Sequence, residues 1–143
     1  AMKKIPLFGY LYARLNILVD RSDKNSRASS LNRSIRALQS GRSIVIFPEG
    51  GIISKNFPHM ANPLKDGAFI MAIQQQVPIV PISFHNNHQV MDDDTLLMRP
   101  GTLHLEIHPP FATKGLTMED LPVLREKVFE SIQNPILAYY GLK

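Results

Sequence analysis

Apolar residues recur every three or four positions in several parts of the chain, and this spacing predicts α-helices. The predicted helices cover residues 5–15, 26–40, 68–73 and 117–134. In the second of these, Ala28, Leu31, Ile35 and Leu38 share one face, and Gly41 follows as a C-terminal stop. The pattern therefore predicts amphipathic helices distributed along the whole chain.

The last predicted helix carries local signals at both ends. Thr117 and Asp120 are three residues apart, which is the spacing of a capping box. Near the other end, Asn134-Pro135 is expected to bend or end the helix, because proline lacks the N–H that a helical hydrogen bond requires.

Strands are predicted where short apolar or alternating runs interrupt the helical spacing. They cover residues 16–19, 43–47, 77–84 and 102–108. Residues 43–47 end in a continuous apolar run, as is typical of a strand buried on both faces of a parallel sheet. In residues 102–108, Leu103, Leu105 and Ile107 alternate with three polar side chains.

Those three polar side chains, His104, Glu106 and His108, share one face of the predicted strand. They are either an ordinary hydrated sheet face or part of a ligand set for zinc, which imidazole and carboxylate groups bind.

Strands alternating with helices indicate an α/β fold, a sandwich with a mixed, largely parallel sheet flanked by helices. The length of 143 residues suits a single domain, residues 1–143. In such sheets ligands bind where strands end and loops begin. Asp20-Arg21 and Pro48-Glu49-Gly50 both occupy such positions, which makes them candidates for a site.

Composition and charge narrow the classes of function. The chain has no cysteine, which excludes disulfides and thiolate metal sites, and no apolar run reaches the ~18–20 residues that span a bilayer. The net charge of +4 divides into +7 for residues 1–72 and −3 for residues 73–143. A basic half suits an anionic membrane surface, a phosphorylated substrate or simply a solvated face. Nucleic acid is not favoured, because no aromatic side chains are interleaved with the basic ones.

Four stretches in order resemble the glycerolipid acyltransferase family, the PlsC-like 1-acyl-glycerol-3-phosphate acyltransferases. They are "KIPLFGYLYARLNILVDRS" at 4–22, "IVIFPEGG" at 44–51, "LKDGAFIMA" at 64–72 and "VPIVPISF" at 77–84. The resemblance implies the fold of glycerol-3-phosphate acyltransferases. It also implies transfer of a fatty acyl group from a thioester to the free hydroxyl of 1-acyl-glycerol-3-phosphate, a step of phosphatidic acid and phospholipid biosynthesis.

In that family the catalytic base is the His of an H-x-x-x-x-D pair that lies upstream of the first of these blocks. Only Ala1, Met2 and Lys3 precede that block here. We therefore expect a domain truncated at its N-terminus, with no catalytic residue in this chain and no turnover by this chain alone.

The resemblance implies substrate-binding roles for residues in two of the blocks. Arg21 would bind the acceptor phosphate, because a guanidinium matches phosphate oxygens bidentately. The substrate-binding residues of the second block would be Phe47, Pro48, Glu49, Gly50 and Gly51. Gly51-Ile52 stands where the family usually has Thr-Arg, so a second cation would have to come from elsewhere. Lys55 and Lys65 are the possible phosphate contacts.

The implied partners are lysophosphatidic acid or a related glycerophosphate, with acyl carrier protein or coenzyme A as the acyl donor and no further cofactor. The resemblance also implies that the intact protein works at the cytoplasmic face of a membrane, either peripherally or through an N-terminal anchor, whereas this chain alone is expected to be soluble.

Three other interpretations stay open at this point. His88 and Asp93 match H-x-x-x-x-D literally but follow the fourth block, so a solvated loop is favoured over a metal site with His85 or a catalytic role. The whole chain could instead be a non-catalytic module of the same fold that binds phosphate or lipid headgroups. An unrelated nucleotide-binding domain is disfavoured, because neither glycine-rich phosphate motif occurs.

Overall fold

A computed structural model describes residues 16–17, 24–51, 57–91 and 98–142. The chain divides into two compact units, Ala1–Val45 and Ile46–Lys143, which are described separately below. Predictions for residues 5–15 and 18–19 lie outside the described residues.

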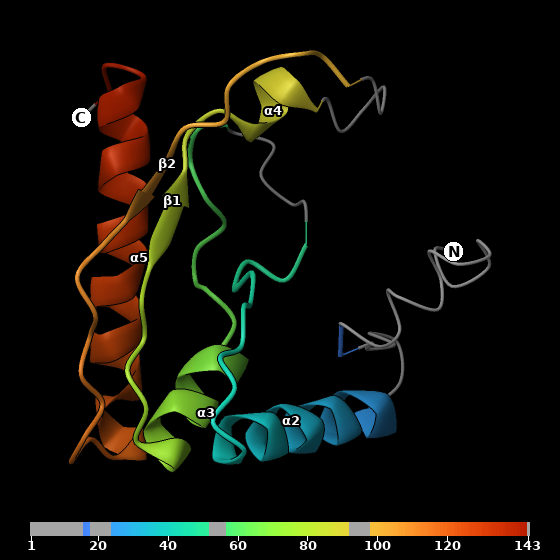
Figure 1. Ribbon diagram of the computed structural model, residues 1–143. Helices are drawn as coiled ribbons and strands as arrows, with labels where there is room; N and C mark the ends of the chain where they lie inside the picture. The colour runs from blue at the N-terminus through green and yellow to red at the C-terminus, as the bar shows by residue number, and fades with distance from the viewer. Residues whose placement is uncertain (1–15, 18–23, 52–56, 92–97, 143) are drawn as a thin grey trace, which may run out of the picture. The chain divides into compact units, whose positions relative to one another are not determined.

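The first unit contains helix α2, Lys24–Gln39 (Figure 1). Its C-terminus is a Schellman motif: the N–H of Arg42 donates to the carbonyl of Ala37 at 3.1 Å, and that of Gly41 to Leu38 at 2.9 Å. Gly41 has a φ of +80°, which a glycine adopts without steric cost. The predicted helix and its glycine stop are both confirmed.

The described residues of the second unit form helices and one small sheet (Figure 1). Its elements in chain order are α3 (Gly67–Gln75), β1 (Ile82–Phe84), α4 (Asn87–Val90), β2 (Leu105–Ile107), the 3-10 helix η2 (Met118–Asp120) and α5 (Leu121–Tyr139). Among the described residues, no helix is long and apolar enough to cross a membrane.

The core of this unit lies between α3 and α5 and also includes a residue of the preceding loop. Its buried side chains recur at the helical spacing seen in the sequence, and burying each removes apolar surface from water. They are Leu64, Phe69, Ile73, Leu121, Leu124, Val128, Ile132 and Ile136. The predicted helix at residues 68–73 is therefore confirmed, as part of α3.

The start of the last helix is also confirmed. Thr117 and Asp120 form the predicted capping box, in which the Thr117 N–H donates to Asp120 Oδ2 at 2.8 Å. The prediction was that this helix bends or ends near Asn134-Pro135. It does not end there, because α5 continues through Pro135 to Tyr139, and a bend at this point stays a prediction. Five residues of the core cluster lie on α5, and this packing outweighs one missing backbone hydrogen bond.

The sheet differs from the prediction of a mixed, largely parallel one. Within the described ranges β1 and β2 form a two-stranded antiparallel sheet, in which Ile82 faces Ile107 and Ser83 faces Glu106. A parallel connection needs a crossover of a dozen or more residues, usually a helix, whereas the segment between these strands holds the four-residue α4 and turns back on itself.

The prediction of a buried strand at residues 43–47 is also wrong. These residues have no regular structure, and Val45 and Phe47 are 81% and 70% exposed. An apolar run becomes a strand only when a neighbour takes its backbone hydrogen bonds. The strand predicted at 77–84 is confirmed only at its end, since Pro78 and Pro81 have no N–H to pair.

Candidate functional site

The loop at residues 47–51 begins with a tight turn. The N–H of Gly50 donates to the carbonyl of Phe47 at 3.2 Å. The sequence favours this turn, because Pro48 holds its second position and Gly50 its fourth, where type I turns prefer Pro and Gly. Gly50 has a φ of +80°, a conformation that favours glycine. The turn thus follows from local sequence.

A second segment, residues 61–65, holds this loop in place. Glu49 Oε2 accepts a hydrogen bond from the N–H of Ala61 at 3.1 Å, and the N–H of Lys65 donates to the carbonyl of Pro48 at 2.7 Å. Leu64, next to Lys65, is 2% exposed and belongs to the core. The loop is therefore tied to a segment that is anchored in the core.

Helix α5 fixes residues 58–60, which lead directly into that segment. The side chain of Gln133 is buried and makes two hydrogen bonds. Its Oε1 accepts a bond from the N–H of Met60 at 2.6 Å, and its Nε2 donates to the carbonyl of Pro58 at 3.2 Å. A buried amide with both ends bonded holds its partners in one geometry, because breaking either bond leaves a buried polar group unpaired.

The predicted site residues separate into two groups. Arg21 and Lys55 lie outside the described residues, so their roles stay predictions. The turn and its partner segment bring together Phe47, Pro48, Glu49, Gly50, Gly51 and Lys65. The Phe47 ring lies 6.4 Å from that of Phe84 between ring centroids.

Within the described residues, one of the two carboxylate oxygens of Glu49 has no hydrogen-bond donor. Its Oε2 is bonded to Ala61, whereas its other oxygen has no hydrogen bond to any part of the chain that the structure describes. A carboxylate held in this way can accept a hydrogen bond from a substrate hydroxyl.

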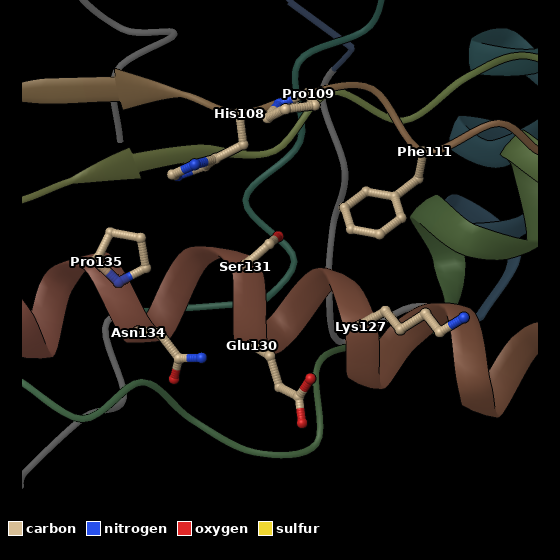
Figure 2. A pocket seen from close by; sticks show the side chains of 8 residues that line it. All are labelled: His108, Pro109, Phe111, Lys127, Glu130, Ser131, Asn134 and Pro135. Carbon is tan, nitrogen blue, oxygen red and sulfur yellow. The ribbon is translucent and has the colours of Figure 1, made fainter. Parts of the chain in front are cut away.

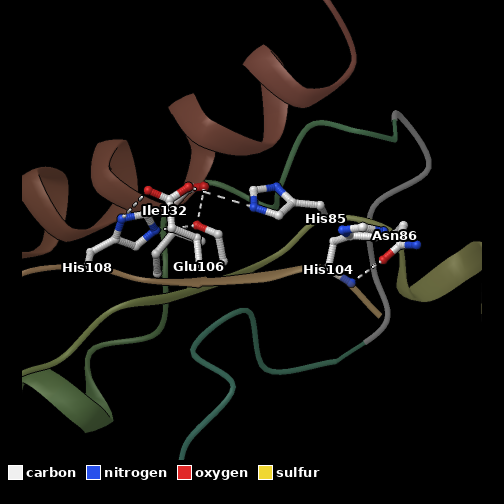
Figure 3. A network of polar contacts seen from close by, with 7 residues as sticks. His85, Asn86, His104, Glu106, His108 and Ile132 are labelled. Atoms are coloured by element: carbon white, nitrogen blue, oxygen red, sulfur yellow. Dashed lines mark hydrogen bonds and ion pairs between the residues drawn. The ribbon is translucent and has the colours of Figure 1, made fainter. Parts of the chain in front are cut away.

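The polar face of the sheet packs against α5, which the sequence did not reveal. Ser83 is fully buried; its hydroxyl donates to the carbonyl of Ile132 at 2.9 Å and lies 2.7 Å from His108 Nε2 (Figure 3). Because that hydroxyl proton is given to Ile132, His108 must donate from Nε2. Glu106 lies 3.6 Å from His108 Nδ1 and 3.8 Å from His85 Nε2.

This network corrects the interpretation of the alternating strand. The prediction of a hydrated face is wrong for His108, whose side chain is 8% exposed, although Glu106 is 54% exposed. The order Ser83, His108, Glu106 resembles a nucleophile, base and acid, yet Ser83 is buried and bonded to α5. The network holds the helix to the sheet. Side chains alternate between the two faces of each strand. Had the pairing of β1 with β2 been known, this alternation would have placed Ser83 and His108 on the same face of the sheet.

The end of α5 carries a cluster of aromatic rings. Tyr140 donates its hydroxyl to the carbonyl of His85 at 2.6 Å, and burial, followed by the neighbouring Tyr139, raises the pKa of Tyr140. His88 is exposed and its ring lies 4.1 Å from that of Phe57 between centroids, whereas Asp93 is outside the described residues. No group of three or more His, Asp or Glu in the described ranges could hold a metal ion.

A shallow groove of about 510 Å³ lies between α5 and the segment after β2 (Figure 2). Its lining is mixed in polarity and consists of His108, Pro109, Phe111, Lys127, Glu130, Ser131, Asn134 and Pro135. None of residues 47–51 lines it, so the groove is separate from the predicted site.

Comparison with known proteins identifies a family. The family model described as Acyltransferase matches residues 1–85, which include the loop at 47–51 and Lys65. The chain is 31% identical over 118 residues to the 1-acyl-sn-glycerol-3-phosphate acyltransferase alpha of Mus musculus, covering 81% of this chain and 40% of that protein. It is 28% identical over 130 residues to the 1-acyl-sn-glycerol-3-phosphate acyltransferase of Saccharomyces cerevisiae, covering 90% and 43%.

A solved structure also matches. The 1-acyl-sn-glycerophosphate (LPA) acyltransferase PlsC from Thermotoga maritima aligns with 99% of this chain and 55% of its own, with a TM-score of 0.77 and 23% identity. At that identity the likeness shows the fold alone, which is an acyltransferase-like α/β fold. The chain spans less than half the length of the mouse and yeast relatives. Since the family model covers more than half of its residues, the chain belongs to the acyltransferase family.

Proposed function

We propose that this chain forms the acceptor-binding part of an enzyme that transfers a fatty acyl group to the free hydroxyl of 1-acyl-glycerol-3-phosphate. Family membership and the names of the mouse and yeast relatives support this reaction. The observation that carries it is the turn at residues 47–51, which presents the Glu49 carboxylate from a loop tied to the core.

The proposal gives separate roles to two charged residues. Glu49 accepts a hydrogen bond from a glycerol hydroxyl through the oxygen that Ala61 does not occupy. Arg21 binds the acceptor phosphate through its guanidinium. Phe47, Pro48, Gly50 and Gly51 shape the loop around the headgroup.

In the reaction proposed, the acceptor oxygen attacks the thioester carbonyl, the C–O ester bond forms and the C–S bond breaks. The hydroxyl proton passes to a base, and the thiolate of acyl carrier protein or coenzyme A leaves and takes up a proton. The base is the His of an H-x-x-x-x-D pair outside these residues. The intact protein works at the cytoplasmic face of a membrane, where both the acceptor and the product reside.

The test uses a protein that carries these 143 residues together with an H-x-x-x-x-D segment. It is supplied with a labelled acyl thioester, on coenzyme A or on acyl carrier protein, and with lysophosphatidic acid. We expect label in phosphatidic acid. As a control, monoacylglycerol offers the same free hydroxyl, with a second hydroxyl in place of the phosphate, and is expected to accept no label.

Absence of transfer to lysophosphatidic acid from both donors would refute the proposal. If the same protein nevertheless bound glycerophosphate, the non-catalytic headgroup-binding module would become the better interpretation.

A further inference from the structure

We infer that Lys65 supplies a cation for a phosphate monoester at the loop of residues 47–51, and that the missing side chain of Gly50 gives the Lys65 stem its place beside the turn. This inference deepens the proposed function and rests on the proposal that the loop binds a glycerophosphate.

The backbone brings Lys65 to the loop. Its N–H donates to the carbonyl of Pro48 at 2.7 Å, and the Ala61 N–H bonds to Glu49 four residues earlier in the same segment. These two bonds, together with buried Leu64, fix where the Lys65 side chain starts. The side chain therefore projects from a defined position rather than from a free surface loop.

The stem of Lys65 lies across Gly50. A Cβ added to Gly50 would be 3.0 Å from Lys65 Cγ, 3.4 Å from Cε and 3.8 Å from Cδ. Three carbons in a row at this distance mean that the stem follows the glycine surface closely, and any other residue there would displace it. The ammonium group is consequently delivered beside the turn.

Lys65 forms no ion pair with the acid beside it in sequence or with the acid of the loop. Asp66 pairs with Arg125, and the Glu49 carboxylate accepts the N–H of Ala61. Among the described residues, the Lys65 ammonium has no ion pair and no hydrogen bond. An exposed cation held beside a glycine turn without an acid partner is suited to an anionic ligand.

The chemistry of the loop selects a phosphate monoester over a simple anion. Lysine binds phosphate as a point charge with three donors, while the free Glu49 oxygen repels an anion but accepts a hydroxyl. A ligand that satisfies both carries a phosphate and a neighbouring hydroxyl, as glycerol phosphates do. The sequence is consistent with this need, because Gly51-Ile52 provides no cation directly after the turn.

The experiment titrates the isotope-labelled 143-residue chain by ¹H–¹⁵N NMR with inorganic phosphate, with glycerol 3-phosphate and with lysophosphatidic acid micelles. We expect shifts at the Gly50 and Lys65 amides with each probe. Tighter binding of glycerol 3-phosphate than of inorganic phosphate indicates that the glycerol is recognised. Tighter binding of the micelles indicates that the lipid form is the ligand.

Lys65→Met keeps the stem and removes the charge, and is expected to raise the Kd for glycerol 3-phosphate about tenfold, because bonds to charged groups are the stronger class. Lys65→Arg should retain binding. Lys114→Met is the matched control: it removes one positive charge near Gln76, at the opposite end of α3.

Equal affinities for wild type and Lys65→Met, or an equal loss in Lys114→Met, would overturn the inference, as would an absence of shifts in residues 50 and 65. Lys65-dependent binding in a protein that transfers no acyl group would refute the proposed function alone. Acyl transfer with binding independent of Lys65 would refute this inference alone.

Discussion

Position 50 places two requirements on its residue, and glycine meets both of them. Its φ of +80° lies in the left-handed region, and its missing Cβ leaves room for the Lys65 stem. Turn chemistry could have indicated the first requirement, since Phe-Pro-Glu-Gly has Pro and Gly where a type I turn prefers them. The contact with Lys65 was not predictable, because it depends on how a segment fifteen residues later folds back.

Gly50→Ala is therefore expected to lower the free energy of unfolding by more than the about 1–2 kcal/mol that a left-handed L-residue costs, because the new Cβ also meets the Lys65 stem. Urea denaturation measures it. Gly115→Ala, with a φ of +83° and open space around it, should show the backbone cost without the contact. Gly67→Ala, at the start of α3, has neither and serves as the baseline. A Gly50→Ala protein as stable as Gly67→Ala would contradict this account.

At the scale of elements, the three long helices of the described residues were predictable. β1 and β2 lie within predicted strands, but their antiparallel pairing was not predicted. The repeats of α2, α3 and α5 are local, and the signals Gly41 and Thr117 lie within a few residues of the ends they mark. A strand requires a partner from elsewhere in the chain, which no local pattern specifies. For this reason residues 43–47 were predicted to be a buried strand, whereas in the structure Val45 and Phe47 are exposed.

The faces of the sheet illustrate the same point. Alternation in residues 102–108 separated the side chains correctly, but the usual rule that the apolar face is buried fails here. Leu105 and Ile107 are 50% and 64% exposed, whereas the face carrying Ser83 and His108 packs on α5. Ser83 and His108 can be buried on this face because the Ser83 hydroxyl bonds the Ile132 carbonyl on α5 and lies within hydrogen-bond distance of His108 across the two strands.

The capping box of η2, the short helix that leads directly into α5, predicts a dependence of stability on pH. Hydrogen bonds from the backbone N–H and then the side chain of Thr117 lower the pKa of Asp120 below 3.8. A lowered carboxyl pKa means that the ionised form stabilises the fold above the unfolded pKa, and that this stabilisation is lost as the pH falls through the folded pKa.

Asp120→Asn should accordingly lower the Tm at pH 7. The difference from wild type should shrink as the pH falls below 3.8, as thermal unfolding followed by circular dichroism will show. Glu119→Gln, one residue earlier and outside the box, is the control and should show a smaller effect at every pH. A pH-independent difference for Asp120→Asn would contradict the electrostatic origin.

At the scale of the whole molecule, the core explains why the candidate loop has a fixed shape. Leu64 is buried in the cluster between α3 and α5, and its neighbours Ala61 and Lys65 bond to the loop. Pro48, from the block at 44–51, and Lys65, from the block at 64–72, are thus hydrogen-bonded to each other. The order of the four blocks along the chain indicated the family. The contact between these two blocks depends on tertiary packing, which the sequence pattern does not specify.

The central claim is that Glu49 and Arg21 act on one glycerophosphate acceptor, and steady-state kinetics of the longer protein test it most directly. Acyl transfer to lysophosphatidic acid is measured for wild type, Arg21→Ala and Glu49→Ala. Loss of a phosphate contact made equally in ground and transition states should raise KM in Arg21→Ala with kcat nearly unchanged, whereas Glu49→Ala should reduce kcat to background. Wild-type kcat/KM in both variants would contradict the account.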